Sequence, residues 1–306
     1  MTENASFRCG TVTLLGQPNV GKSTLLNRIL GEKVSIVTPK PQTTRNRIVG
    51  VLQASDSQVI FLDTPGYTER SGDMYKRMRA SARDAAGDAD VVVFVIDASA
   101  SEKLTEHDRR LLAMGAESGA PIIVVLNKVD RVKPKDRLLP FIQDMMGVQG
   151  VAVVIPVCAR NGDGIDPLLQ EIRERLPVGD RLFPEDIYTN ASERFLCGEL
   201  VREQLLLQLR QEIPHGTAVV IETFEDARDE DGGGICHVEG RIVVPRESHK
   251  VIVLGKGGER IREMSTEARI NMEKLLGSKV FLRMFVVVHS DWMSSPGALE
   301  EYGVGT

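Results

Sequence analysis

The chain has 306 residues, of which 42% are hydrophobic and 26% charged, and its formal net charge is −5. This length predicts about two domains, and the apolar fraction is typical of a globular protein with a buried core. No apolar run approaches the roughly 18 residues of a membrane-spanning helix, and residues 1–10 lack the apolar stretch of a secretory signal. We therefore expect a soluble intracellular protein. Taken over the whole chain, the negative charge argues against a nucleic-acid partner.

The cysteines and histidines are scattered. Cys9, Cys158, Cys197 and Cys236 form no CxxC pair, and the five histidines do not cluster either. A zinc site needs local pairs of ligands, and a disulfide framework is unusual in so long a chain. We expect four reduced cysteines and no zinc.

Strand-length apolar runs alternate with amphipathic helical patterns over residues 1–176. Strands are expected at 11–15, 49–53, 58–62, 91–96, 121–126 and 152–157, and helices at 21–30, 73–86, 105–117 and 166–176. Continuous β-branched runs such as VVVFVI are typical of strands buried on both faces. The alternation predicts an α/β fold, a doubly wound and mostly parallel sheet with helices on both sides.

The pattern changes after residue 176. Pro177, Gly179 and Pro184 predict a linker over 177–190. Beyond it we expect a helix at 192–211, strands at 217–222 and 235–244, helices at 248–254 and 259–276, and a strand at 280–288. The order α-β-β-α-α-β predicts a smaller α+β domain. The expected divisions are a first domain at 1–176, a second at 191–290 and a C-terminal tail at 291–306.

A GxxxxGK[ST] pattern lies between the first expected strand and the first expected helix. It comprises Gly16, Gln17, Pro18, Asn19, Val20, Gly21, Lys22 and Ser23, followed by Thr24. In such a loop, backbone N–H groups and the helix N-terminus surround phosphates. Lys22 supplies charge for the β- and γ-phosphates, and the Ser23 hydroxyl is a suitable ligand for Mg²⁺. The segment predicts a nucleotide site.

Asp63-Thr64-Pro65-Gly66 ends the third expected strand. Ligands bind at the carboxyl edge of parallel sheets, where this segment lies. Asp63 is placed to hold Mg²⁺ through its water shell, and the Gly66 amide can point at the γ-phosphate. The following segment can then respond to the presence of that phosphate.

Asn127-Lys128-Val129-Asp130 ends the fifth expected strand and indicates the base. A carboxylate accepts two hydrogen bonds, and guanine offers N1–H and a 2-amino group along one edge, whereas adenine does not. If ATP were bound, Asp130 would be desolvated and would have no hydrogen-bond partner. A site of this kind therefore discriminates strongly against ATP. We expect Asn127 to tie this loop to the phosphate loop and Lys128 to lie along the purine. A backbone amide for the guanine O6 could come from Cys158, Ala159 or Arg160.

The second domain carries a GxxG loop between two expected helices. It consists of Gly255, Lys256, Gly257 and Gly258, in the element order of a KH domain, whose GxxG loop clamps single-stranded nucleotides. A plain helix–helix connection would explain a bare GxxG equally well. Residues 181–306 are acidic overall, but residues 241–283 carry ten basic and five acidic side chains. We expect RNA contacts from Lys250, Gly255, Lys256, Gly257, Gly258, Arg260 and Arg262.

These motifs, with Gln42-Thr43-Thr44-Arg45-Asn46-Arg47-Ile48-Val49-Gly50 and Phe183-Pro184-Glu185-Asp186, resemble the Era family of bacterial GTPases over nearly the whole chain. The resemblance implies a P-loop GTPase domain followed by a KH domain. It also implies GTP hydrolysis, with slow unassisted turnover of roughly 10⁻⁴ to 10⁻² s⁻¹.

The resemblance also implies roles for single residues. A threonine of the first switch would complete the Mg²⁺ shell, and we choose Thr44 over Thr43. The catalytic set is then Lys22, Thr44, Asp63 and Gly66, with Mg²⁺ at Ser23, Thr44 and Asp63. Tyr67 stands where Ras-type enzymes carry a glutamine that orients water. Asn19 is the residue that would help to hold K⁺, and Arg45 and Arg47 are candidates for an arginine finger.

The partners implied are GTP and GDP, the 3′ end of small-subunit ribosomal RNA and the small ribosomal subunit, whose maturation the protein would assist. The resemblance also implies a cytoplasmic location with peripheral membrane association, and we expect a monomer. One alternative is a signalling GTPase whose C-terminal domain binds a protein, which the local basic stretch disfavours. Another is a P-loop kinase or ATPase, which Asn127-Lys128-Val129-Asp130 disfavours.

Overall fold

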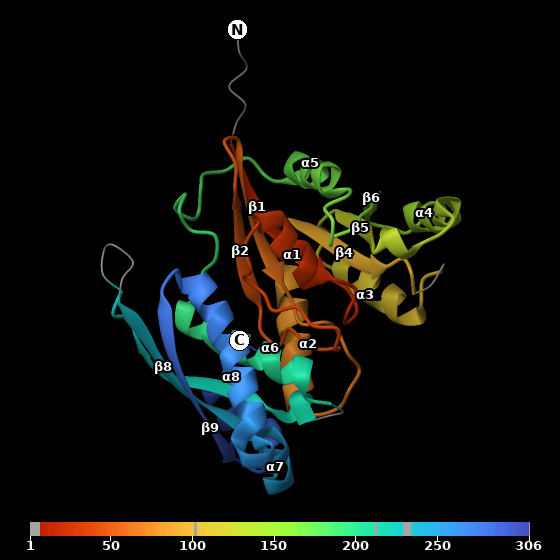
Figure 1. Ribbon diagram of the computed structural model, residues 1–306. Helices are drawn as coiled ribbons and strands as arrows, with labels where there is room; N and C mark the ends of the chain where they lie inside the picture. The colour runs from red at the N-terminus through yellow and green to blue at the C-terminus, as the bar shows by residue number, and fades with distance from the viewer. Residues whose placement is uncertain (1–6, 101–102, 211–212, 229–233, 306) are drawn as a thin grey trace.

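The computed structural model describes residues 7–100, 103–210, 213–228 and 234–305, which form two units with separate sheets (Figure 1). The strands of the first sheet lie in the order β2-β3-β1-β4-β5-β6. Their bounds are Arg8–Leu15 (β1), Ile48–Gln53 (β2), Ser57–Asp63 (β3), Val91–Asp97 (β4), Ile122–Asn127 (β5) and Val151–Pro156 (β6). Only β2 is antiparallel to its neighbour. The expected mostly parallel α/β fold is confirmed.

Helices cover both faces of this sheet. They are α1 (Lys22–Leu30), α2 (Asp73–Gly87), α3 (Glu106–Ala116), α4 (Leu138–Met146) and α5 (Ile165–Arg175). Alternate residues of β4 enter different cores: Val91, Val93 and Val95 pack with α1 and α5, whereas Val92, Phe94 and Ile96 pack with α3 and α4. This is the two-residue period of a strand buried on both sides. The sequence did not predict α4.

The second unit has a three-stranded sheet in the order β7-β8-β9, with β8 and β9 parallel. Its elements are α6 (Glu193–Gln208), β7 (Ala218–Glu225), β8 (Ile235–Val244), α7 (Glu247–Leu254), α8 (Glu259–Leu276) and β9 (Lys279–Val288). Helices α6 and α8 cover one face of the sheet. The expected order α-β-β-α-α-β is confirmed. Residues 229–233, between β7 and β8, and residue 211 lie outside the described residues.

The expected C-terminal tail is folded. It contains a short 3-10 turn at Trp292–Ser294 and the helix α9 (Pro296–Glu301). The Trp292 side chain is fully buried, and its indole N–H donates to the Gly216 carbonyl at 3.1 Å. It belongs to a cluster with Met74 and Met78 of α2. The C-terminal segment therefore packs between a helix of the first unit and the sheet of the second.

The linker runs along the edge of the first sheet. The Val51 amide donates to the Tyr188 carbonyl at 2.8 Å, and the Thr189 hydroxyl donates to the Val49 carbonyl at 2.6 Å. These bonds satisfy the open edge of β2, which would otherwise be available to another chain. They also fix the point at which the chain enters α6.

The four cysteines are buried and unpaired. In the described part of the chain, no three His, Cys, Asp or Glu side chains group as metal ligands. Within the same ranges, no helix combines the length and apolarity needed to cross a membrane.

Candidate nucleotide and RNA sites

The phosphate loop joins β1 to α1 and needs its glycines. Gly16 has φ 150° and Gly21 has φ 103°. A Cβ at Gly16 would lie 2.4 Å from the Val95 carbonyl oxygen, and a Cβ at Gly21 would lie 2.3 Å from Asn127 Nδ2. These close contacts let the backbone of the loop pack against β4 and β5 while its N–H groups line the cavity.

Lys22 is buried at the base of this loop. Its Nζ donates to the carbonyls of Gly16 at 3.1 Å and Gln17 at 3.2 Å. Burial lowers the pKa of Lys22 to about 8, although the nearby Asp63 acts to raise it. A phosphate that approaches this amine would stabilise its charged form strongly, because the negative charge of the phosphate replaces the solvation that burial removes.

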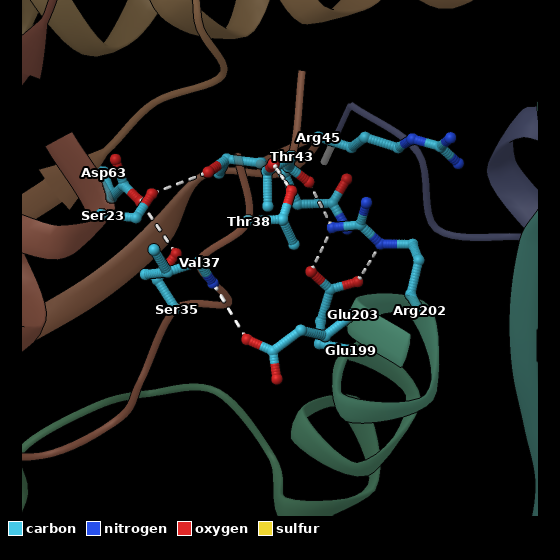
Figure 2. A network of polar contacts seen from close by, with 12 residues as sticks. Ser23, Ser35, Val37, Thr38, Thr43, Arg45, Asp63, Glu199, Arg202 and Glu203 are labelled. Carbon is cyan, nitrogen blue, oxygen red and sulfur yellow. Dashed lines mark hydrogen bonds and ion pairs between the residues drawn. The ribbon is translucent and has the colours of Figure 1, made fainter. Parts of the chain in front are cut away.

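Four oxygen-bearing side chains meet beside Lys22. Asp63 Oδ2 accepts hydrogen bonds from Ser23 Oγ at 2.6 Å and Ser35 Oγ at 2.9 Å, and Ser23 Oγ lies 2.9 Å from Thr44 Oγ1 (Figure 2). Asp63 Oδ1 is buried without a hydrogen-bond partner. Burial raises the pKa of Asp63, against the effects of Lys22 and the hydroxyls. This set fits Mg²⁺, which prefers oxygen ligands, and a cation or its water would satisfy the orphaned oxygen.

The cluster opens into a cavity of about 430 Å³. Its lining comes from the phosphate loop, from the segment before β2, and from Gly66, Lys128 and Arg131. A second cavity of about 280 Å³ continues from it and is lined by Gly21, Thr24, Val37, Asn127, Lys128, Asp130, Arg131, Cys158, Ala159 and Arg160. The structure thus brings the predicted phosphate and base residues together. Ser35, Val37 and Arg131 carry no recognisable motif, and the sequence did not predict them.

Asn127 links the base loop to the phosphate loop, as expected. Its Nδ2 donates to the Val20 carbonyl at 2.8 Å, and its Oδ1 accepts from the Ala159 amide at 3.0 Å. The Cys158 amide donates to the Asp163 carbonyl at 2.9 Å. Two of the three amides considered for the guanine O6 therefore already have acceptors within the protein.

Asp130 faces the second cavity as a carboxylate. Its Oδ1 accepts from Cys158 Sγ at 3.2 Å, and Arg160 Nη2 lies 3.5 Å from Oδ2. The Cys158 hydrogen bond and the Arg160 charge lower the pKa of Asp130 in spite of some desolvation. Lys128 Nζ donates hydrogen bonds to Asp97 Oδ2 at 2.7 Å and to the Asn19 carbonyl at 2.5 Å, and these two bonds fix the position of its side chain.

The segment before β2 separates the two candidate threonines. Thr44 Oγ1 faces Ser23, whereas Thr43 Oγ1 bonds to Thr38 Oγ1 at 2.7 Å. The guanidinium of Arg45, which is only 4% exposed, donates to the carbonyls of Pro214, His215 and Thr217. Arg45 is thus directed into the second unit and away from the phosphate cavity, and Arg47 is exposed. This arrangement does not fit Arg45 as an arginine finger.

Gly66 packs directly on the phosphate loop. A Cβ at this position would lie 2.8 Å from the Pro18 Cα. The next residue, Tyr67, donates its amide to the Gly16 carbonyl at 3.4 Å, and its ring packs edge-on against His107. The chain after Asp63 therefore stays close to the position of the phosphates.

The GxxG loop joins α7 to α8. Gly255, Gly257 and Gly258 have φ values of 71°, 61° and 78°. A Cβ at Gly255 would lie 2.7 Å from the Arg260 Cβ, whereas Gly257 and Gly258 face open space. Arg260 Nη1 donates to the Ile252 carbonyl at 2.7 Å and so closes the end of α7. The loop presents backbone and positive charge to solvent.

The basic stretch 241–283 divides into two groups. Arg241, Arg269, Lys279 and Arg283 each pair with a glutamate. Among the described residues, no ion pair is found for the four cations predicted to contact RNA: Lys250, Lys256, Arg260 and Arg262. Arg246 and Lys274 have no ion pair within the described residues either, so four of the six unpaired cations of the stretch are those predicted to contact RNA. The neighbouring Val251 and Ile252 are 66% and 38% exposed and were not predicted from the sequence.

Comparisons with known proteins agree with this geometry. A protein-family model described as 50S ribosome-binding GTPase matches residues 11–128, and a KH-domain model matches residues 212–293. GTPase Era of Pseudomonas entomophila is 41% identical to this chain and the alignment covers 100% of this chain and 99% of that protein. The chain belongs to the Era family of GTPases. GTPase Era of Syntrophus aciditrophicus is 40% identical, with 97% and 95% covered.

Solved structures of Era match both units at once. A crystal structure of Era in complex with MgGDPNP and nucleotides 1506–1542 of 16S ribosomal RNA has a TM-score of 0.91 at 36% identity, and covers 97% of this chain and 99% of that one. An Aquifex aeolicus Era variant bound to GDP and aluminium fluoride matches equally well. The family resemblance inferred from the motifs is confirmed, with its GTPase and KH domains in the expected order.

Proposed function

We propose that this Era-family chain hydrolyses GTP, binds the 3′ end of small-subunit ribosomal RNA through its KH domain, and assists maturation of the small ribosomal subunit. One observation carries the proposal: the phosphate and base cavities and a GxxG loop with unpaired positive charge occur in one chain whose fold matches Era bound to MgGDPNP and 16S ribosomal RNA.

The residues of the first site divide the work. Lys22 and the amides of the phosphate loop bind the β- and γ-phosphates. Ser23 and Thr44 would hold Mg²⁺ directly and Asp63 through water, and the bound ion would neutralise charge on the phosphates. Gly66 lies where its amide can meet the γ-phosphate. Asp130 reads guanine, and the Cys158 and Arg160 contacts keep it ionised.

The water that attacks GTP must be oriented without a glutamine after Gly66. Tyr67 stands there, and its ring packs against His107. We infer slow unassisted turnover from this substitution. Asn19 donates its Nδ2 to the Pro39 carbonyl at 2.9 Å, which leaves its Oδ1 as a ligand for K⁺ near the phosphates. Rate measurements in KCl and NaCl test this role.

We further propose domain limits of 1–176 and 191–290, and a monomer. The proposed partner, the small ribosomal subunit, places the protein in the cytoplasm. Peripheral association with the inner face of the membrane is part of what the family resemblance implies, and co-sedimentation with lipid vesicles tests it.

Gly258→Asp tests the RNA site. The new carboxylate would stand where phosphates approach the loop, so we expect RNA affinity to fall at least about tenfold. The probe is a labelled RNA with the sequence of nucleotides 1506–1542 of 16S ribosomal RNA, followed by fluorescence anisotropy. GTP hydrolysis without RNA should not change, because the hydrogen bonds described for the loop stay within α7, α8 and their junction and do not reach the first unit.

Gly277→Asp is the matched control. Gly277 also has a positive φ, of 67°, and also faces open space, but it ends α8 at the far end from the GxxG loop. It therefore carries the same backbone cost and the same charge. Equal loss of RNA binding in both variants, or in neither, would contradict the KH interface and favour a protein partner.

A further inference from the structure

The segment 33–47, here called the switch segment, is held between the two units. On one side it contacts the candidate metal site, through Ser35 to Asp63 and Thr44 to Ser23. On the other side it contacts the second unit at several points, from Lys33, Val37, Lys40, Thr43, Arg45 and Asn46. Figure 2 shows Ser35 and Val37 lying between Asp63 and Glu203 of α6.

Arg202 of α6 is bound to the backbone of the switch segment. Its Nε and Nη2 donate to the two carboxylate oxygens of Glu199 at 2.7 and 2.5 Å, and Nη2 also donates to the Thr43 carbonyl at 2.5 Å. The Thr43 carbonyl and the Thr44 nitrogen belong to one rigid peptide plane. The position of Arg202 therefore sets the orientation of Thr44, whose hydroxyl faces Ser23.

Glu203, the next residue of α6, holds the first half of the switch segment. Its Oε1 accepts from the Val37 amide at 3.1 Å, and its Oε2 lies 2.5 Å from Lys33 Nζ. Ser35, two residues before Val37, donates to Asp63. Two adjacent residues of one helix thus hold the two parts of the segment that meet the metal site.

The burial of these charges suggests a role beyond stability. Arg202 and Glu203 are 4% and 5% exposed, and Arg202 Nη1 is buried without a partner. The cation of Arg45 lies nearby and is equally buried. Buried charges are costly, and apolar residues of similar size would often serve a mere packing contact as well. The free-energy cost of burying Arg202 and Glu203 is understandable if their contacts orient a functional segment.

We propose that Arg202 and Glu203 of the KH domain are positioning residues for GTP hydrolysis, which hold the switch segment so that Thr44 and Ser35 face the metal site. Neither side chain touches the nucleotide. The inference rests on the proposed function, because it needs GTP to be hydrolysed at this site. Wild-type hydrolysis and GDP binding test that function separately.

Arg202→Lys in the full chain tests the proposal. Lysine keeps the charge but lacks the planar fork that binds Glu199 and Thr43 together. We expect kcat for GTP to fall about tenfold and the Mg²⁺ concentration needed for half-maximal rate to rise, with GDP affinity changed less than about twofold. We expect kcat and GDP affinity to respond differently because Thr44 would contact the metal and the γ-phosphate, and GDP has no γ-phosphate.

Arg194→Lys on the same helix is the control. Arg194 donates to the Ile221 and Glu222 carbonyls within the second unit, and these hydrogen bonds do not involve the switch segment. Its kcat should equal that of the wild type. An Arg202→Lys variant that behaves like Arg194→Lys, or that loses GDP affinity as strongly as kcat, overturns the proposal.

Glu203 provides a second test that does not depend on Arg202. Glu203→Gln keeps an oxygen for the Val37 amide and should lose less of kcat than Glu203→Ala, which removes both contacts. Equal rates in the two variants, at equal GDP affinity, would overturn the role of the Val37 contact.

Discussion

Lys22 makes nucleotide affinity dependent on pH. The pKa of its buried amine is about 8 in the free protein, and phosphates would raise it. Above this pH, binding must therefore take up a proton, and affinity falls as pH rises. From pH 7 to 8.5 we expect the GDP affinity to fall about fourfold. Calorimetry in two buffers with different ionisation enthalpies should show that GDP binding takes up more protons at pH 8.5 than at pH 7. Proton uptake that does not change with pH would contradict this assignment.

Asp130 decides the base. In Asp130→Asn the carboxamide offers an NH₂ that clashes with the guanine donors but matches the 2-oxo group of xanthine. An unpaired polar contact of about 3 kcal/mol corresponds to a loss of GTP affinity of about 100-fold, with a gain for XTP. Competition binding of GTP and XTP measures both. Asp136→Asn, which neutralises an exposed carboxylate six residues on, should leave both affinities as in the wild type. Unchanged GTP affinity in Asp130→Asn would refute the base assignment.

The residues that could be predicted from the sequence are those that belong to recognisable motifs. Asn127 lies against Val20 because the phosphate loop and the base loop both end buried parallel strands, which a motif and its spacing can reveal. Ser35 contacts Asp63, and Arg202 contacts the Thr43 carbonyl, only because the irregular switch segment packs between the two units. No local pattern predicts such contacts. The same reason explains Arg45, which was a candidate arginine finger and is instead bound by three carbonyls of the other unit.

At the scale of elements, strands buried on both faces were the most predictable, because β4 is apolar at every position from Val91 to Ile96. Helix α4 was missed because Pro140 interrupts its apolar pattern. In the structure Pro140 lies in the first turn of α4, where a proline costs no hydrogen bond. The C-terminal segment was also misjudged. Its short, glycine-containing sequence has no clear period, but Trp292 gives it a buried anchor.

At the scale of the whole molecule, the distribution of charge matters more than its sum. The net charge of −5 argued against nucleic acid, yet glutamates pair with Arg241, Arg269 and Arg283, and the described residues show no ion pair for the cations beside the GxxG loop. The two units are also joined more closely than a linker implies. The switch segment is bound by α6, and α2, which follows the Asp63–Gly66 motif, packs on the C-terminal segment.

The contact between α2 and the C-terminal segment can be followed through Trp292, the single tryptophan of the chain. Met78 of α2 is 1% exposed and lies in the Trp292 cluster. Met78→Ala should leave a cavity there and cost about 2–5 kcal/mol of unfolding free energy. The substitution should also make the Trp292 side chain more accessible to solvent, so we expect the tryptophan fluorescence emission of the folded protein to shift to longer wavelength.

Met145→Ala controls for stability alone. Met145 is also 1% exposed, but it lies in the core between α4 and the first sheet, away from the second unit. Its unfolding midpoint in urea should fall by a similar amount, while the Trp292 emission of the folded state stays as in the wild type. If Met78→Ala lowers the midpoint and leaves the emission unchanged, α2 does not hold the C-terminal segment.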